Sequence, residues 1–376
     1  MKPKFEVADV FRRYGDEYKS KYPITEEQRK VMAAISVCRT AELGGHSEVC
    51  DHCAALRNSY NSCRNRHCPK CQTMTKEEWL EKRKQELLPC GYFHMVFTIP
   101  HDLNPLIMSE RKKFLSLLFR AVRNTVLSFA ADPQWKLEGK PGLLTILHTW
   151  SQTLIDHFHI HCLIPAGVLS FDGRRWNPSG DKYLFRVQSL AKEFKKQYLS
   201  LIIEHLDLER NPPNSKILMQ KAREKSWIIY AKKPFAGPEQ VLEYLGRYTH
   251  RIAISNHRLK SIDNGQVTFT YKDRQNNKQK EMTLSCLEFI RRFLLHVLPS
   301  RFMKIRYYGF LANMCKAKSI LLIRRLIGKD METKLFVQET LQEKVLRLTG
   351  KDITLCTHCK IGRMTIMEPL PEFSTG

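Results

Sequence analysis

The stretch DHFHIHCLIPAG, residues 156–167, alternates histidines with apolar side chains. Successive side chains of a β-strand point to opposite faces, so the three histidines, His157, His159 and His161, share one face. Alternate residues lie about 6.6 Å apart along a strand and the outer two histidines about 13 Å apart, so only two neighbours can bind one ion. The stretch therefore predicts a strand that carries a metal-binding pair, with an ordinary solvated pair as the alternative.

A second strand is expected just before this one, over LLTILHTWSQ (residues 143–152). A short turn at residues 153–156 separates the two runs, and we expect them to pair with His148 opposite His161. The face that carries the histidines then also includes Gln152. The neighbouring strand therefore offers His148 or Gln152 as a third metal ligand.

The composition favours a protein that binds nucleic acid. Lys and Arg number 62 against 38 Asp and Glu, a formal net charge of +24 spread along 376 residues. Such a surplus is unfavourable through self-repulsion unless a polyanion neutralises it, so DNA is the expected partner and a solvated basic surface the alternative. Arginines interrupt the longest apolar runs, and the N-terminus has no apolar core of a signal peptide. We therefore expect no membrane segment and a cytoplasmic bacterial protein, nucleoid-associated when bound to DNA.

The segment CDHCAALRNSYNSCRNRHCPKC (residues 50–71) has the spacing of a zinc site. Each of its two Cys-x-x-Cys pairs can give two thiolates to one tetrahedral, structural zinc, with reduced unliganded cysteines as the alternative. The predicted ligands are Cys50, Cys53, Cys68 and Cys71, and spare ligand types nearby are Cys63, His67 and His46. The interleaved basic residues, which we expect to face DNA phosphates, are Arg57, Arg64, Arg66 and Lys70.

The C-terminal motif CTHCKIGRM (residues 356–364) contains one further pair, Cys356 and Cys359. A single pair supplies only half of a tetrahedral zinc site. The sequence leaves three alternatives open: a shortened zinc ribbon, a site that borrows Cys63 and His67, or a metal-free turn.

The segment EYLGRYTHR (residues 243–251) puts two tyrosines on one helix face, because Tyr244 and Tyr248 are four residues apart. Two such rings on a helix would ordinarily pack into a core. Their basic neighbours argue against a core here: Arg247, His250 and Arg251. We therefore interpret the two phenols as facing a phosphate backbone.

These patterns together predict a reaction on DNA. A tyrosine hydroxyl attacks a phosphodiester and forms a phosphotyrosine link, with release of a 3′-hydroxyl. Because a free phenol has a pKa of about 10, we expect a divalent ion bound by the histidine pair to polarise the phosphate. Mg²⁺ or Mn²⁺ suits such a site once water and phosphate oxygens complete it.

The rest of the chain is predicted to mix helices and strands. A capping box at Thr25 and Gln28 marks the start of a helix, and an Asp-Asn-Gly turn at residues 263–265 predicts a hairpin. Further helices are expected over residues 75–88, 105–131, 186–206 and 239–251 and within the last 60 residues, and further strands over 90–101 and 227–235.

Five motifs in this order resemble the HUH-type rolling-circle transposases of the insertion-sequence-ninety-one family. They are YNSCRNRHCPKCQ (60–72), FHMVFTIPHDLNPLI (93–107), HFHIHCLIPAG (157–167), YLGRYTHRIAISN (244–256) and YYGFLANMC (307–315). The resemblance implies a zinc-binding N-terminal domain and a catalytic domain whose antiparallel sheet carries the histidine pair, with the tyrosine helix across it. It matches the metal pair to His159 and His161 and the two nucleophiles to Tyr244 and Tyr248. The third metal ligand stays open among His157, His148, Gln152 and His250.

We therefore expect an α+β chain in three parts. These are a small helical zinc- and DNA-binding domain at 1–89, an antiparallel-sheet HUH catalytic domain at 90–312, and a helical C-terminal region with the cysteine pair at 313–376. The expected DNA contacts are Arg64, Arg66, Lys70, Arg247 and Arg251.

The expected activity is metal-dependent nicking and joining of single-stranded element ends and target DNA, with host replication factors exposing the strands. The alternatives are a plasmid replication initiator or relaxase with the same chemistry and a non-catalytic zinc-dependent DNA-binding protein. The sequence leaves the oligomeric state open.

Overall fold

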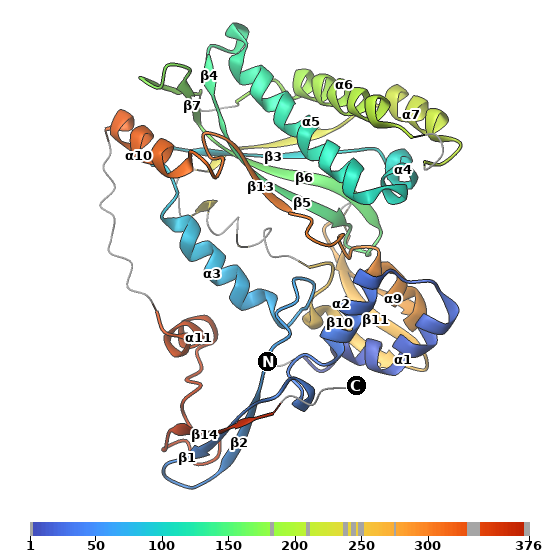
Figure 1. Cartoon of the computed structure of the whole chain (residues 1–376), viewed down its shortest axis with the longest axis vertical. Helices are drawn as coiled ribbons and strands as arrows, with labels where there is room; N and C mark the ends of the chain where they lie inside the picture. Colours follow the sequence, from blue (N-terminus) through green and yellow to red (C-terminus); the bar gives the residue numbers. More distant parts are fainter. Residues whose placement is uncertain are drawn as a thin grey trace.

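Figure 1 shows the computed structural model of the chain, a mixed α+β structure built from antiparallel sheets. The structure describes residues 3–180, 184–207, 211–235, 240–241, 246, 252–273, 276–328 and 339–371. The strands within these ranges form one five-stranded sheet and three three-stranded sheets. The expected α+β fold class is therefore confirmed.

The five-stranded sheet has the order β13-β5-β6-β3-β9, and every neighbouring pair is antiparallel. Its strands are β3 (Tyr92–Thr98), β5 (Gly142–Trp150), β6 (Asp156–Pro165), β9 (Ile229–Phe235) and β13 (Ile305–Gly309). Strands β5 and β6 are buried over most of their length, so both faces of the sheet are covered. Their β-branched and aromatic side chains suit such a surface, and the strands predicted here are confirmed.

One face of this sheet is covered by helices, most visibly α5 and α6 (Figure 1). The helices on this side are α4 (Asn104–Ser109), α5 (Arg111–Ala131), α6 (Val187–His205) and α7 (Ser215–Glu224). Phe97 of β3 packs edge-on against Phe194 of α6, with ring centroids 5.1 Å apart. Among the described residues, α5 alone is long and apolar enough to cross a membrane, and 56% of its apolar window is buried, as in an ordinary core helix.

The other face packs against α3 (Gln72–Lys84) and α10 (Lys316–Ile327). Leu144 of β5 and Leu163 of β6 share a buried apolar cluster with Ile323 of α10. This face is the one that carries the histidines, because side chains two residues apart on a strand point the same way.

A second compact unit forms around the sheet β10-β11-β12. Its elements are α1 (Val7–Lys21), α2 (Glu26–Ser36), β10 (Leu259–Asp263), β11 (Gln266–Lys272), β12 (Gln279–Ser285) and α9 (Cys286–Leu294). Phe11 of α1 meets Phe293 of α9 at a ring-centroid distance of 5.3 Å. The N-terminal helices therefore share a core with a segment about 250 residues later in the chain.

Two small sheets complete the described fold. The first has the order β14-β1-β2, with β1 (Gly45–Cys50), β2 (Leu56–Tyr60) and β14 (Met364–Leu370), and the second joins β4 (Gly139–Lys140), β7 (Gly167–Ser170) and β8 (Trp176–Pro178). Helix α11 (Leu341–Thr349) lies between α10 and β14 in the sequence. The C-terminal strand thus returns to the N-terminal hairpin (Figure 1).

Two local predictions are confirmed in detail. The side chains of Thr25 and Gln28 cap the first turn of α2 reciprocally, as the capping box predicts. Asn264 and Gly265 both have positive φ, 46° and 71°, and close the tight hairpin between β10 and β11.

Candidate active site and cysteine clusters

Three histidines converge on the central sheet. His148 of β5 and His159 and His161 of β6 each offer a ring nitrogen, and these atoms all lie within 4.8 Å of one another. All three side chains are buried, with exposed fractions of 4%, 6% and 7%. Buried imidazoles are stable as neutral rings, which is the form that binds metals. The set therefore fits a divalent ion whose remaining coordination positions are filled by oxygen ligands.

The register between β5 and β6 differs from the predicted one. His148 pairs with His159 and not with His161, because the hairpin closes at the Trp150–Asp156 pair and a one-residue shift follows between Trp150 and His148. The shift places the ring of His148 beside both β6 histidines, with centroids 5.4 Å from His159 and 4.4 Å from His161. A bulge of this kind redirects side chains, and the alternation of residue types in the sequence does not reveal it.

The other described third-ligand candidates do not belong to this converging set. The ring of His157 lies beside that of His159, with centroids 4.7 Å apart, and stacks against His101 at 5.4 Å. Gln152 lies in the turn after β5, where its carbonyl oxygen accepts a hydrogen bond from Arg258 at 2.6 Å. His250 lies outside the described residues. Among the described candidates, the geometry therefore favours His148 as the third metal ligand.

Neighbouring groups orient two of the three rings. Nδ1 of His159 lies 2.8 Å from the carbonyl oxygen of His157, so Nδ1 carries the proton and donates it, and Nε2 keeps the lone pair that a metal needs. Nδ1 of His161 lies 3.0 Å from Nε2 of His94 on β3. Burial, with a smaller contribution from the charge of Lys232, lowers the pKa of His94 to about 3, so this ring is neutral at pH 7.

Sequence reasoning missed His94, although a signal was present. In the strand expected over 90–101, His94 stands among apolar residues, where a polar side chain needs a partner. The β3–β6 register pairs Val96 with His161, so His94 is the diagonal neighbour of that ligand on the same face.

The predicted nucleophiles, Tyr244 and Tyr248, lie outside the described residues, as do Arg247 and Arg251. Two described residues flank Tyr244 in the sequence. Val241 is fully buried in the apolar cluster on the histidine face of the sheet. A Cβ atom on Gly246 would lie 3.0 Å from Cδ1 of Leu80 on α3, which packs against the same cluster.

One cysteine cluster contains predicted zinc ligands together with a cysteine that the sequence did not identify as a ligand. Its sulfurs belong to Cys38, Cys63, Cys68 and Cys71, and Cys71 Sγ lies 3.6 Å from the sulfurs of both Cys38 and Cys63. A tetrahedron with metal–sulfur bonds of about 2.3 Å has edges of about 3.8 Å, so these separations fit one zinc. Cys63 is thus a member of the cluster, and Cys38 is a member that the spacing gave no means to identify.

The predicted grouping of Cys50 and Cys53 with Cys68 and Cys71 is not what the structure shows. Cys50 and Cys53 lie at the turn of the β1–β2 hairpin, and their neighbours are Cys359 and Cys356, with sulfur separations of 3.7 and 3.8 Å. Cys71 instead precedes the first turn of α3. The hairpin therefore separates the two Cys-x-x-Cys pairs that the sequence places close together.

The spare histidines of this region do not join either cluster. His67 is half-buried beside positive charges, and desolvation of its ring, helped by the charge of Arg66, lowers its pKa to about 3. His46 lies on β1, where its Nε2 is 3.8 Å from a carboxylate oxygen of Glu48.

Several basic residues expected to face DNA make internal contacts instead. Arg66 donates to the carbonyl oxygens of Leu298, Pro299 and Phe302 at 3.3, 3.0 and 2.6 Å, and burial lowers its pKa. Lys70 Nζ lies 3.0 Å from the carbonyl oxygen of Cys38 and 2.6 Å from a carboxylate oxygen of Glu6. Arg57 pairs with Glu48 at 2.7 Å. These cations stabilise the packing around the cysteine clusters.

Arg64 is placed differently. Its side chain is exposed and borders a surface hollow of 1130 Å³ between the β1–β2 hairpin and α11. The other polar residues that line this hollow include Arg39, His46, Tyr60, Asn61 and Gln342. Positive charge beside an aromatic ring suits contact with a nucleic-acid strand.

Comparisons with known proteins agree with this arrangement. A family described as "Transposase zinc-binding domain" matches residues 10–99, and a family described as "Putative transposase" matches residues 142–318. The chain is 42% identical over 384 aligned residues to "Putative transposase y4qJ" of Sinorhizobium fredii, covering 96% of this chain and 95% of that protein. It is 30% identical over 303 residues to "Transposase for insertion sequence element IS801" of Pseudomonas savastanoi pv. phaseolicola, covering 76% of this chain and 70% of that protein. No solved structure matches the chain significantly.

Proposed function

This chain belongs to the insertion-sequence-ninety-one (IS91) family of transposases, and on that premise we propose that it nicks and rejoins single-stranded DNA through a 5′-phosphotyrosine intermediate. The observation that carries the proposal is the convergence of His148, His159 and His161 on a buried antiparallel sheet. The names of the relatives favour transposition over plasmid replication initiation, which uses the same chemistry.

The proposed step is a transesterification. The hydroxyl oxygen of Tyr244 or Tyr248 attacks the scissile phosphorus, the bond from phosphorus to the 3′-oxygen breaks, and that oxygen leaves as a 3′-hydroxyl. The phenolic proton is lost to solvent or to a nearby base, and a proton reaches the departing oxygen. Attack by a 3′-hydroxyl on the phosphotyrosine reverses the step, so strands are rejoined without ATP. Two tyrosines permit two such steps on the element ends and the target.

The three histidines would hold a divalent ion, Mg²⁺ or Mn²⁺. When bound, this ion supplies positive charge that polarises the scissile phosphate and stabilises the charge on its oxygens. His159 is oriented by the carbonyl of His157 and His161 by His94, so the donor nitrogens are held before DNA arrives. Val241 packs on the histidine face and Gly246 lies beside Leu80 of α3, and these two described residues support our proposal that the tyrosine segment acts near these rings.

The zinc-binding domain would serve the same reaction by organising α3. Cys38, Cys63, Cys68 and Cys71 are the proposed ligands of its structural zinc, and Cys71 immediately precedes α3. Leu80 of α3 contacts Gly246, so a zinc-fixed helix end would hold the tyrosine segment against the sheet. We also propose that the chain is divided into domains at residues 1–89, 90–312 and 313–376.

The proposed partners follow from the chemistry. A nickase of this kind acts on single-stranded element ends and target DNA, and host replication factors would expose those strands. DNA contacts are proposed for Arg64 and for the basic residues beside the tyrosines, Arg247 and Arg251. A protein with this substrate works in the bacterial cytoplasm, on the nucleoid.

A covalent-adduct assay tests the proposal. The protein is incubated with labelled single-stranded element ends and Mg²⁺ or Mn²⁺, denatured, and separated by electrophoresis. We expect an adduct that survives denaturation, is lost in the double variant Tyr244→Phe/Tyr248→Phe, and nearly disappears in His159→Ala/His161→Ala. Tyr230→Phe is the matched control, because Tyr230 is exposed on β9 and should leave the yield unchanged. An adduct that persists in the double phenylalanine variant would overturn the assignment of the nucleophiles.

A further inference from the structure

The sheet β14-β1-β2 is held together without an apolar core. No residue of these three strands, and none of α11, belongs to the three buried apolar clusters of the described chain. Ile366 and Met367 of β14 and Leu341 and Leu346 of α11 are exposed. Burial of apolar surface therefore cannot hold the C-terminal segment in place, and small units in this position need a cross-link or a metal.

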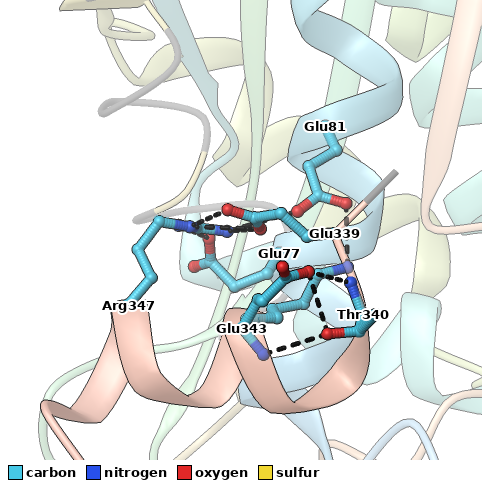
Figure 2. A network of polar contacts seen from close by, with 7 residues as sticks. Glu77, Glu81, Glu339, Thr340, Glu343 and Arg347 are labelled. Carbon is cyan, nitrogen blue, oxygen red and sulfur yellow. Dashed lines mark hydrogen bonds and ion pairs between the residues drawn. The ribbon is translucent and has the colours of Figure 1, made fainter. Parts of the chain in front are cut away.

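The attachment of α11 is polar. Figure 2 shows Arg347 between the carboxylates of Glu339, Glu77 and Glu81, and Lys344 Nζ lies 2.9 Å from a carboxylate oxygen of Glu81. The Arg347 pairs are partly exposed, so they contribute little stability and salt screens them, and desolvation offsets the attraction in the more buried Lys344–Glu81 pair. The backbone pairing of β14 with β1 adds to this network, and a metal cross-link would restrain the C-terminal segment further.

The sulfurs of Cys50, Cys53, Cys356 and Cys359 have the geometry of a metal site that would form such a cross-link. The separations of 3.7 Å for Cys50–Cys359 and 3.8 Å for Cys53–Cys356 match the edge of about 3.8 Å in a tetrahedral zinc–thiolate site. They are far from the sulfur–sulfur bond of about 2.05 Å in a disulfide. The two pairs therefore form a complete set of four zinc ligands.

The two pairs also have the same local shape. Each second cysteine is followed by a residue with positive φ, Ala54 at 58° and Lys360 at 59°. Backbone N–H groups donate to a sulfur in both turns, from Cys53 to Cys50 Sγ at 3.5 Å and from Gly362 to Cys359 Sγ at 3.3 Å. Such donors stabilise thiolates, so each turn is built as half of a metal site.

Contacts between the turns fix their mutual position. The carboxylate of Asp51 accepts a hydrogen bond from the backbone N–H of Arg363 at 2.7 Å, and the Asp51 N–H donates to the Arg363 carbonyl at 3.0 Å. Gly362 permits this approach, because a Cβ atom there would lie 2.6 Å from Cys50 Sγ and 2.5 Å from Asp51 Oδ1.

We propose that Cys50, Cys53, Cys356 and Cys359 bind a second zinc ion, which clasps the C-terminal turn of Cys356 and Cys359 to the β1–β2 hairpin. The matched zinc-binding domain, residues 10–99, contains only two of these four ligands, so the site goes beyond it. The clasp fixes one wall of the hollow beside Arg64, because Met364 and Ile366 of the tail line that hollow. The proposal does not depend on the nicking chemistry.

Zinc content is the first test. We define the tail variant as Cys356→Ser, His358→Ala and Cys359→Ser together, since His358 Nδ1 lies 3.8 Å from Cys53 Sγ and could replace a lost ligand. Purified wild-type chain should contain two zinc equivalents, and the tail variant one. Cys38→Ser/Cys63→Ser should also contain one, and the control Cys90→Ser/Cys315→Ser two, because these cysteines lie in neither cluster. A tail variant with two equivalents, or a wild-type chain with one, overturns the proposal.

A cut chain gives a test that does not depend on stoichiometry. A recognition site for a sequence-specific protease replaces residues 331–337, and the folded full chain is cleaved there. At about 0.5 M salt, which screens the ion pairs of α11, the fragment that follows the cut should co-elute with the body while zinc is present. A chelator should release it, and in the tail variant it should separate without chelator. A wild-type fragment that separates at once, or a tail-variant fragment that stays, overturns the proposal.

Discussion

Nε2 of His94 lies 3.0 Å from Nδ1 of His161, so a ring on β3 orients a candidate metal ligand on β6. For His161 to bind a metal through Nε2, its Nδ1 must carry the proton and donate it to His94. We expect His94→Leu to weaken Mn²⁺ binding about 10–100-fold, as loss of such orienting partners does. Titration calorimetry measures the effect, and His94→Gln, which keeps an acceptor on the side chain, should restore part of the affinity. Unchanged Mn²⁺ affinity in His94→Leu would contradict this role.

The choice between His148 and His157 as third ligand can be decided with a matched pair. His148→Ala removes a member of the converging set and should lower adduct yield at limiting Mn²⁺ about 10–100-fold. His157→Ala keeps the backbone carbonyl that orients His159, so its yield should stay within a few-fold of wild type. The metal dependence of both variants is read from the same denaturing gel. Equal losses in the two variants would argue against His148 as the ligand.

Arg66 and Arg64 should separate a structural from a DNA-binding role. Arg66→Ala leaves three carbonyl oxygens without their charged donor and should lower the free energy of unfolding by about 2–3 kcal/mol. Arg66→Lys should not restore it, because an ammonium group cannot reproduce the guanidinium geometry.

Arg64→Ala should leave the unfolding midpoint in place. It should weaken binding of single-stranded DNA and reduce the salt dependence of that binding by about one phosphate contact. Denaturant titration and fluorescence anisotropy measure the two properties for each variant. Full stability with loss of DNA binding in Arg66→Ala would reverse the two assignments.

The stability of the fold should fall in acid partly because of His296. Burial lowers the pKa of this residue to about 3, and the charge of Arg111 contributes, while an unfolded histidine titrates near 6.5. Between these values the unfolded chain binds a proton that the folded chain does not, so the free energy of unfolding decreases as the pH falls. The loss from this residue is about 2 kcal/mol at pH 5.

The measurement compares denaturant unfolding at pH 7 and pH 5 in wild type and His296→Gln. The glutamine can still donate to the carbonyl of Leu154, which Nε2 of His296 approaches at 3.2 Å. We expect the variant to lose about 2 kcal/mol less on acidification than wild type. The same loss in both proteins would show that His296 does not titrate on unfolding.

Local patterns in the sequence predicted the local structure well, because they express local physics. Alternation of histidines with apolar residues predicted β6, the Thr25–Gln28 pair predicted the capped start of α2, and the Asp-Asn-Gly sequence predicted the hairpin turn at Asn264 and Gly265. Each of these features depends on residues within a few positions of one another.

The remainder depends on contacts that spacing does not encode. The hairpin closure and a strand irregularity together set the register of His148, and His94 reaches the site from a strand in which it lies 67 residues before His161. Closeness in the chain predicts that Cys50 and Cys53 join Cys68 and Cys71, whereas the hairpin places Cys50 and Cys53 beside Cys356 and Cys359. For the tyrosine segment, the sequence supplies the motif and the described structure only its neighbours, Val241 and Gly246.

The pairing of Cys53 with Cys356 also determines when the site can form during translation, because 303 positions separate the two residues. A ribosome that adds about 5–20 residues each second synthesises the turn of Cys50 and Cys53 about 15–60 s before the turn of Cys356 and Cys359. Under the proposed clasp, every nascent or prematurely terminated chain has an open half-site and an incomplete wall beside Arg64. The hollow is then finished only in a fully translated chain, so an element copy with a late stop codon would encode a protein whose two ends cannot be joined.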